Sequence, residues 1–404
     1  MLLFLFPYKF TDSFNQRHQI DILKKKLNTK IEIHDLSNIL NKEWNKAFLN
    51  KRHKTARVYN SVNEWENYIK KLYLKEKKIF VVNLLDRNSF NSVRIHKILN
   101  NNKIQLLQFC SPEVCIKKNK HKAYFKEKIL KFFQILFSNP NRLFFLIKTK
   151  IFSEMINLIK YENLFIFYTG KKKFMKPSLN SKNKKFITFN SQDYSNYLLD
   201  KTKQNKKKNY ILFLDAPTPY FLGDKQLFKY KIKYNTKKWY KDLNSFLSQI
   251  ENKFNSKIII IPHPRVMKFK NPYYDKKFEV RTDIGATSKL IPKSKFVIAI
   301  SCTMAVSYCV LNYKKILLIY NNQIVQQNPN MMSNLTFMSK VLKINLFNLN
   351  RKIEKNKLLN PVNKKVYDNY KFNYLTSKKV INKMNFKIFN SFLNNRITKE
   401  TYGN

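Results

Sequence analysis

Three polar clusters come directly after apolar runs in the second half of the sequence, and their side chains could together help a hydroxyl displace a phosphate. The clusters are Asp215 after Ile211–Leu214, His263-Pro264-Arg265 after Ile258–Ile261, and Ser301 with Thr303 after Val297–Ile300. The carboxyl ends of parallel strands meet at one edge of a sheet, where open α/β proteins bind their ligands. The spacing therefore predicts one site built from all three clusters.

Asp215 is the candidate base of this site. A carboxylate at the end of an apolar strand is costly to bury unless it has a role. Near an acceptor hydroxyl it could take the proton as the hydroxyl attacks. Asp193 and Asp224 are rival carboxylates, and a simpler alternative is that Asp215 only caps the turn near Thr218.

His263 is the only histidine after residue 121, and Arg265 follows it closely. Two donors at one strand end would stabilise a departing phosphate electrostatically. Arg281 could add a further donor. The alternatives are a structural histidine and a solvated guanidinium at Arg281.

Ser301 and Thr303 stand between a predicted strand and the predicted helix 305–311. Backbone N–H groups, hydroxyl donors and the positive end of a helix dipole bind anions at such a position, and phosphate is the natural occupant. The alternative is that one of these hydroxyls merely caps its helix.

Alternating strand and helix patterns must position the clusters, and they predict an α/β fold with two parallel sheets. In the first half we expect strands at 2–6, 79–85, 104–109 and 164–168, with helices at 16–27, 62–74 and 92–99. In the second half we expect strands at 210–214, 257–261, 296–300 and 315–320, with a helix at 236–254. The basic segments 171–185 and 201–208 are expected to be a linker and a solvated loop.

A chain of 404 residues fits two domains better than one. We expect a Rossmann-like acceptor-binding domain at 1–170 and a Rossmann-like donor-binding domain at 171–365, both doubly wound and facing a cleft. Helices at 366–404 are expected to cross back to the first domain.

The segment 122–160 combines an apolar stripe with a basic rim. Apolar residues recur at helical spacing from Ile129 to Phe137, Pro140 interrupts the pattern, and 143–159 resumes it. A helix pair packed on the sheet is one interpretation. Docking on an anionic membrane surface is the other, because basic amphipathic helices lie in that interface.

The formal net charge is +54, from 79 Lys and Arg against 25 Asp and Glu. A field of this sign attracts nucleic acid, anionic lipid and phosphorylated substrates alike. Only 10 of the basic residues are Arg, although nucleic-acid sites depend on Arg forks, and the charge is spread along the whole chain. We therefore expect no nucleic acid partner, and a nucleic-acid-binding protein remains only the non-enzymatic alternative.

The cysteines have neither a zinc spacing nor a disulfide framework, so reduced, buried thiols are expected at Cys110, Cys115, Cys302 and Cys309. The apolar start, 2–6, has no basic region before it and ends at Pro7, which favours a strand over a signal peptide. No apolar stretch of about 18 residues occurs. These features predict a cytoplasmic protein.

The segments around the three clusters resemble those of bacterial cell-surface polysaccharide glycosyltransferases of the GT-B architecture, and in particular the sialyl-, polysialyl- and Kdo transferases that use CMP-sugars. The matching segments, within about residues 185–325, are Asn190–Tyr194, Phe213–Asp215, Trp239–Asn244 with Phe246, Ile261–Arg265, Arg281, Thr287 with Leu290, and Ser301–Ser307. In the first half only Phe14 and His34–Ser37 agree. The chain departs from the pattern at Ala216 and Ile300, where a polar residue and a His are expected.

The resemblance implies an inverting, metal-independent sugar transfer that needs no cofactor. Asp215 would be the general base and His263 would meet the donor phosphate. The donor nucleotide or its phosphate would be bound by His263, Pro264, Arg265, Arg281, Ser301, Thr303 and Ser307. The expected donor is a CMP-linked nonulosonic acid or Kdo-type sugar. The expected acceptor is a lipid-linked or oligosaccharide glycan such as O-antigen or capsule, met at the inner face of the cytoplasmic membrane.

An alternative enzyme keeps the fold and changes the donor. Polyol-phosphate transferases of the teichoic-acid type also combine GT-B domains with His-Pro motifs, and they use CDP-activated donors. Such an enzyme would leave phosphodiesters in its product, whereas a glycosyltransferase leaves glycosidic bonds.

Overall fold

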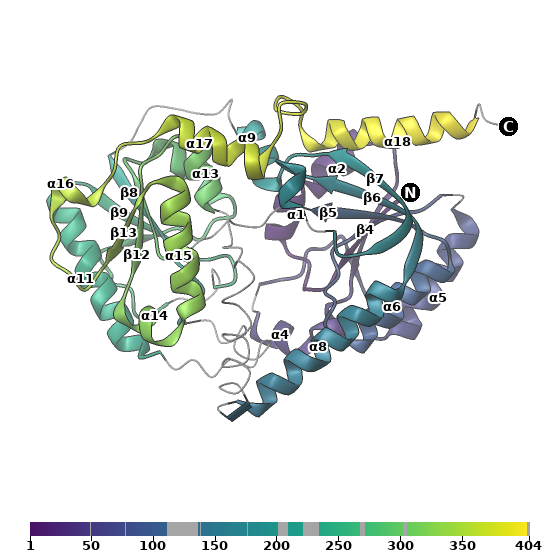
Figure 1. Cartoon of the computed structure of the whole chain (residues 1–404), viewed down its shortest axis with the longest axis horizontal. Coiled ribbons are helices and arrows are strands. Elements are labelled where there is room, and N and C mark those ends of the chain that lie inside the picture. Colours follow the sequence, from purple (N-terminus) through teal and green to yellow (C-terminus); the bar gives the residue numbers. More distant parts are fainter. Residues whose placement is uncertain are drawn as a thin grey trace.

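The computed structural model describes residues 1–48, 50–76, 78–110, 136–137, 139–175, 177–200, 209–220, 234–266, 271–301 and 305–401. These residues form two α/β domains that lie side by side along the long axis of the molecule (Figure 1). Each domain is built on one parallel sheet, as the alternation of strand and helix patterns predicts.

The first sheet has seven parallel strands in the order β3-β2-β1-β4-β5-β6-β7. They are β1 (Leu2–Phe6), β2 (Ile31–Asp35), β3 (Ala56–Val58), β4 (Phe80–Asn83), β5 (Gln105–Cys110), β6 (Lys160–Tyr168) and β7 (Asn180–Thr188). The strand order reverses between β1 and β4, as in a Rossmann sheet.

The second sheet repeats this topology with six parallel strands in the order β10-β9-β8-β11-β12-β13. They are β8 (Tyr210–Leu214), β9 (Lys257–Ile261), β10 (Glu279–Val280), β11 (Val297–Ala299), β12 (Ile316–Tyr320) and β13 (Asn345–Asn348). Here the order reverses between β8 and β11, so this sheet binds a ligand best where those two strands end.

Helices cover both faces of each sheet. In the first domain they are α1 (Asp12–His18), α2 (Ile20–Lys26), α3 (Ser37–Leu40), α4 (Lys42–Ala47), α5 (Val62–Lys75), α6 (Phe90–Asn101) and α8 (Pro140–Leu158). In the second they are α9 (Gln192–Asp200), α11 (Thr236–Phe254), α12 (Ala286–Leu290), α13 (Ala305–Leu311), α14 (Asn322–Gln327), α15 (Pro329–Leu342), α16 (Lys355–Leu358) and α17 (Lys364–Tyr370). Short 3₁₀ turns at Lys172–Phe174 and Ile291–Lys293 complete the two domains.

The strand residues explain why both faces are covered. In β8, Leu212 and Leu214 pack into one core with α13, whereas Ile211 and Phe213 pack into another with α11. Such strands are apolar at every position, and burying both sides requires helices on both sides. The same division holds in the first domain.

The expectation of a linker at 171–185 is wrong in part, because β7 begins at Asn180 and pairs in parallel with β6. The first sheet thus extends past residue 170. Lys182, Lys184 and Lys185 are exposed on this edge strand, and charged side chains keep an edge from pairing with other chains. These same lysines gave the segment the composition of a loop. The expected basic loop 201–208 lies outside the described residues.

The chain passes between the domains twice, and the two passages lie against each other. Ser191 donates its N–H to the Leu375 carbonyl at 2.7 Å on the way into the second domain. The amide of Asn190 donates to the carbonyls of Val380 and Lys383 at 3.2 and 2.6 Å, on the way back. The returning chain follows α17 through a π-helical turn, Lys371–Leu375.

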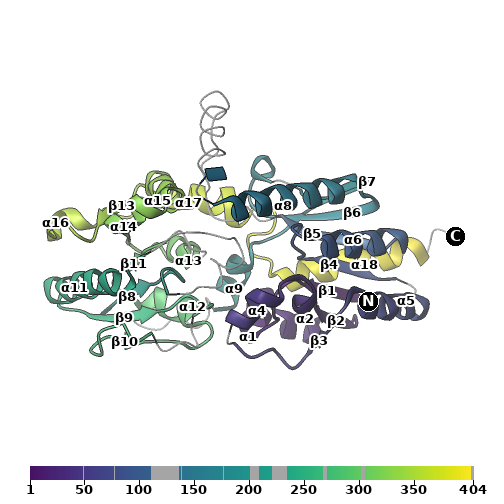
Figure 2. The same cartoon turned by 90° about the horizontal axis from the view of Figure 1, so that it is seen from below.

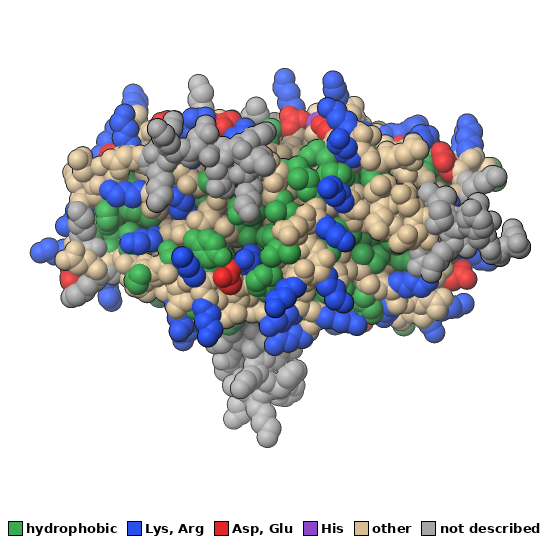
Figure 3. All heavy atoms as spheres, turned by 90° about the horizontal axis from the view of Figure 1, so that it is seen from above, with side chains coloured by type: hydrophobic (Ala, Val, Ile, Leu, Met, Phe, Trp, Pro, Cys, Tyr) green, Lys and Arg blue, Asp and Glu red, His purple; other side chains and the backbone are tan. Residues whose placement is uncertain are grey.

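The last helix, α18 (Asn385–Thr401), packs on the first domain, as Figure 1 shows. Phe389 and Leu393 belong to the same apolar core as Phe4 and Phe80 of the first sheet. Within the described ranges, every helix is too short or too polar to span a bilayer. Lysines and arginines are spread over both domains on the face seen in Figure 3, in agreement with the even charge distribution of the sequence.

Candidate active site

A pocket of about 690 Å³ lies between the two domains at the carboxyl edge of the second sheet. Its walls include Tyr8, Phe14, Arg17, Trp44 and Phe48 from the first domain, and Asp193, Asp215, Pro262–Arg265, Thr287 and Tyr308 from the second. The volume lies within the range of small-molecule sites, about 300–1,000 Å³. The pocket therefore brings Asp215 together with His263, Pro264 and Arg265, as the strand ends predict.

Asp215 stands at the point where the strand order of the second sheet reverses. The residue before it, Leu214, is in register with Ile261 of β9 on one side and Ala299 of β11 on the other. The side chain is 3% exposed. Burial raises the pKa of Asp215 to about 7, and hydrogen bonds from Tyr274, Ala216 and Tyr240 act in the opposite direction.

The two oxygens of Asp215 have different partners. Oδ2 accepts the hydroxyls of Tyr274 and, at 3.5 Å, of Tyr240. Among the residues that the structure describes, Oδ1 accepts only the backbone N–H of Ala216, at 2.8 Å. The ring of Tyr240 is also stacked on that of Tyr273, with centroids 5.5 Å apart. The tyrosines therefore fix the orientation of the carboxylate and leave Oδ1 able to accept a further proton donor.

His263 is half-buried, and its ring orientation is set by the chain itself. The backbone N–H of Arg265 donates to Nδ1 at 3.2 Å, so the ring proton of the neutral imidazole is on Nε2. Burial, followed by the positive charges of Arg265 and Arg17, lowers the pKa of His263 to about 3. At neutral pH His263 is thus an uncharged hydrogen-bond donor.

The His-Pro loop is held against the first domain. The amide of Asn50 donates to the Pro264 carbonyl at 3.2 Å. The guanidinium of Arg265 lies 5.7 Å from the ring centroid of Trp44, and Val266 packs with Trp44 and Phe48 in a small apolar cluster. These contacts close one side of the pocket.

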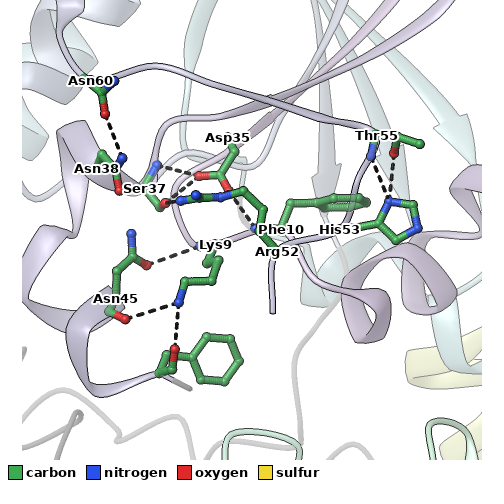
Figure 4. Close-up of polar contacts among 11 residues, drawn as sticks. Lys9, Phe10, Asp35, Ser37, Asn38, Asn45, Arg52, His53, Thr55 and Asn60 are labelled. Carbon is green, nitrogen blue, oxygen red and sulfur yellow. Dashed lines mark hydrogen bonds and ion pairs between the residues drawn. The ribbon is translucent and has the colours of Figure 1, made fainter. Parts of the chain in front are cut away.

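Asp35 organises the loops behind the first-domain wall of the pocket (Figure 4). It is fully buried at the end of β2. Oδ2 accepts the Phe10 N–H at 3.0 Å and Arg52 Nε at 2.7 Å, and Oδ1 accepts the N–H and hydroxyl of Ser37. Because all these bonds stay within the first domain, Asp35 has a positioning role.

Figure 4 also shows Lys9, the residue before Phe10, with its ammonium directed at the end of α4. Its ammonium donates to the carbonyls of Phe48 at 2.7 Å and Asn45 at 3.4 Å. These carbonyls lie at the end of α4, so Lys9 fixes the turn that carries Trp44 and Phe48. Cations at a helix C-terminus also stabilise its dipole.

Asp193, the rival carboxylate, lines the same pocket from α9. It is 7% exposed, and its Oδ2 has no hydrogen-bond partner within the described part of the chain. Burial raises the pKa of Asp193 to about 6, and the charge of Arg17 opposes that shift. The pocket therefore contains two buried carboxylates, while the other rival, Asp224, lies outside the described residues.

The remaining candidate residues that the structure describes, Arg281, Ser301 and Ser307, do not line the pocket. Arg281 is held at the surface by Asp283 and Glu279, at 2.9 and 3.3 Å. Ser301 follows β11, and its buried hydroxyl has no partner among the residues that the structure describes. Ser307 is buried in α13, and Thr303 lies outside the described residues. The expected phosphate-binding hydroxyl cluster is thus only partly visible.

Several residues of the first-domain wall have no signal in the sequence. Arg17 comes from α1, and Tyr8, Trp44 and Phe48 come from loops or from the short helix α4. They belong to no motif, because their place in the pocket depends on how the domains are packed. Tyr274, which holds Asp215 from within the second domain, is missed because it lies in a loop that has no strand or helix pattern.

Within the described ranges, no group of three or more His, Cys, Asp or Glu side chains is placed to hold a metal ion. The described thiols, Cys110 and Cys309, are free and buried, as expected.

The sequence matches no protein-family model and none of the curated proteins. Solved structures with a similar fold include the wall teichoic acid polymerase TagF, at 9% identity over 99% of this chain and 89% of that one, with a TM-score of 0.45. Others are Phytolacca americana UGT2 with UDP-2fluoro-glucose and pterostilbene (7% identity, 97% and 94% coverage, TM-score 0.43) and UDP-GlcNAc 2-epimerase from Neisseria meningitidis (12%, 97% and 99%, 0.41).

The architecture itself is that of a GT-B protein. Two Rossmann-like domains face each other across a pocket, and the last helix returns from the second domain to the first. This confirms the fold expected from the sequence.

Proposed function

We propose that the protein is an inverting, metal-independent glycosyltransferase that moves a sugar from a nucleotide donor to a hydroxyl of a cell-surface glycan. The observation that carries this proposal is the presence of Asp215 and His263 in one pocket between the domains. A buried carboxylate at one strand end can take the proton of the attacking hydroxyl, and a hydrogen-bond donor at the adjacent strand end can assist the leaving phosphate.

Asp215 acts as the base in this scheme. The acceptor hydroxyl attacks the anomeric carbon while Oδ1, which accepts one backbone N–H within the described part of the chain, takes its proton. The bond between the anomeric carbon and the phosphate oxygen breaks, and the nucleotide departs with the electron pair. A single displacement of this kind inverts the configuration at the anomeric carbon.

His263 assists the departing phosphate. Its Nε2–H is the ring donor, because Nδ1 already accepts the Arg265 N–H. The imidazole is uncharged, so the positive charge at this end of the pocket comes from Arg17 and Arg265, whose fields act on His263. Donors and cations at the site of developing charge lower the barrier.

The acceptor is assigned to the first-domain wall. Tyr8, Trp44 and Phe48 present aromatic surface to the pocket there. Trp44 and Phe48 are themselves almost fully buried, and the Tyr8 ring combines an apolar face with a polar hydroxyl. The assignment of a CMP-linked nonulosonic acid or Kdo-type sugar as the donor rests on the resemblance of the motif segments alone.

A nucleotide panel tests the donor. We expect CMP to raise the midpoint of thermal unfolding more than CDP, UDP or GDP, because a ligand that binds only the native state stabilises it by mass action. The His263→Ala variant should show a smaller shift with the same nucleotide, since Nε2–H is lost. A shift with UDP and none with CMP would show that the donor is a UDP-sugar and not a CMP-sugar. No shift with any nucleotide would contradict the proposal.

Analysis of the product distinguishes the alternative enzyme. A glycosidic bond between donor sugar and acceptor is the expected result. Phosphodiester linkages would instead identify a polyol-phosphate transferase of the teichoic-acid type.

A chelator tests the absence of a metal requirement. We expect full activity after treatment with EDTA, because residues of the chain itself would stabilise the leaving group. Re-addition of Mg²⁺ or Mn²⁺ serves as the control, and a strict dependence on either ion would contradict the scheme.

A further inference from the structure

Helix α8 buries one face in the first domain and exposes the other. Leu143 and Ile156 are buried, and Phe152 and Met155 pack on the same apolar core. The apolar residues that α8 exposes are Phe144 (68%), Leu146 (41%), Ile147 (46%), Ile151 (53%) and Leu158 (83%). Packing on the sheet therefore accounts for only half of the apolar residues of this helix.

The exposed residues form a stripe. Phe144, Ile147, Ile151 and Leu158 are separated by three, four and seven positions, so they share one side of the helix. Of the fourteen large apolar side chains that are exposed in the described part of the chain, five lie on α8. Single exposed apolar residues need no explanation, but a contiguous patch marks an interaction surface.

Basic residues accompany this stripe on the same helix. Figure 2 shows α8 lying next to α6 in the first domain. The charged residues of α8 are Arg142, Lys148 and Lys150 against Glu154 alone. The ammonium of Lys148 lies 6.0 and 5.8 Å from the ring centroids of Phe144 and Phe152, so its stem covers the stripe while its charge reaches water.

We propose that the exposed stripe of α8 docks the protein on an anionic lipid bilayer, with the helix lying in the plane of the interface and its own lysines, Lys148 and Lys150, contacting headgroups. A basic helix with one apolar face binds such a surface through apolar burial and electrostatic attraction together. A second copy of the chain is a poorer occupant, because it would bring the same lysines together. The inference is independent of the reaction assigned to Asp215.

Binding of the full-length protein to vesicles tests the docking. We expect phosphatidylcholine vesicles that contain phosphatidylglycerol to bind the protein, pure phosphatidylcholine vesicles to bind it weakly, and added salt to reduce the difference. The double variant Phe144→Ser/Ile151→Ser should partition about a hundredfold less, because two large apolar side chains no longer enter the interface.

Two further variants complete the test. Leu74→Ser removes an equally prominent side chain, 86% exposed on α5, and should bind like the unmodified protein. Lys148→Glu/Lys150→Glu, both exposed on α8, should lose the preference for anionic vesicles. Equal binding to both vesicle types, or unchanged binding of the α8 variant, would overturn the proposal. So would a dimer of the unmodified protein that Phe144→Ser/Ile151→Ser converts to a monomer. Unchanged midpoints of thermal unfolding show that the variants are folded.

Discussion

The Asp215→Asn variant is expected to transfer sugar about 10²- to 10⁴-fold more slowly, which is the usual contribution of a general base. The amide keeps the shape of the side chain, and its oxygen can still accept from Tyr240 and Tyr274. Its NH2 then faces the Ala216 N–H, so the loss combines the missing proton acceptor with one lost backbone hydrogen bond. In the unmodified protein, kcat/KM should rise as the pH increases through about 7, where Asp215 loses its proton.

The same variant should be more stable than the unmodified protein at alkaline pH. The pKa of Asp215 is raised from 3.8 to about 7, so the folded state binds more protons than the unfolded state between these values. Stability therefore falls as the pH rises through this window, and the full cost is present above about pH 7. It amounts to at most about 4 kcal/mol, at 1.36 kcal/mol per pKa unit. Thermal unfolding above and below pH 7 measures it.

Asp193→Asn is the matched comparison for both effects. Asp193 lines the pocket as well, but we expect its variant to lose less than about tenfold in rate, because a binding contact contributes less than a base. A large loss in Asp193→Asn together with a small loss in Asp215→Asn would transfer the role of base to Asp193.

Gly170→Ala is expected to lower the midpoint of thermal unfolding by about 10 °C, which corresponds to roughly 3 kcal/mol in a domain of this size. Gly170 has a φ of +63°, and a Cβ there would lie 2.1 Å from the carbonyl oxygen of Asn373 and 2.7 Å from the nitrogen of Tyr374. Both atoms belong to the backbone of the returning chain, so neither can move without displacing it.

Gly285→Ala separates the two causes of the lower unfolding midpoint, which are the strain of a positive φ and the clash of the new Cβ with the backbone. Its φ of +79° imposes a similar strain, but the nearest atom to a Cβ is the side-chain nitrogen of Gln16, at 2.4 Å, which can rotate away. We expect a loss of about 3 °C from backbone strain alone. Equal losses in the two variants would show that the returning chain does not press on Gly170.

Most central strands were predictable because nearly all their positions are apolar, whereas the interior strand β2, which contains Glu32, His34 and Asp35, was missed. The bounds expected for β8 and β9 agree with the structure residue by residue, and α11 and α13 also begin and end where expected. The edge strands were missed: β3 and β10 have only three and two residues, and β7 is rich in lysine. An edge strand buries too little of itself to require an apolar sequence.

In the candidate site, too, the residues next to clear apolar strands were predictable and the others were not. Asp215 and His263 were identifiable because each follows a recognisable strand, and strand ends converge in any parallel sheet. Arg281 follows the short strand β10, and its two carboxylate partners hold it at the surface. Arg17 and Trp44 could not be found, because a pocket between domains depends on packing that no local pattern encodes.

The double passage of the chain has a mechanical consequence. One connection between two bodies lets them bend and twist in any direction. Here the connections at Asn190 and Thr376 are tied by a hydrogen bond of 2.5 Å, and two connections tied at one place favour rotation about a single axis. Admission of the donor and release of the product would share that one motion. The distance between Trp44 and Val266, which lie on opposite domains, would then measure how far the two domains have separated.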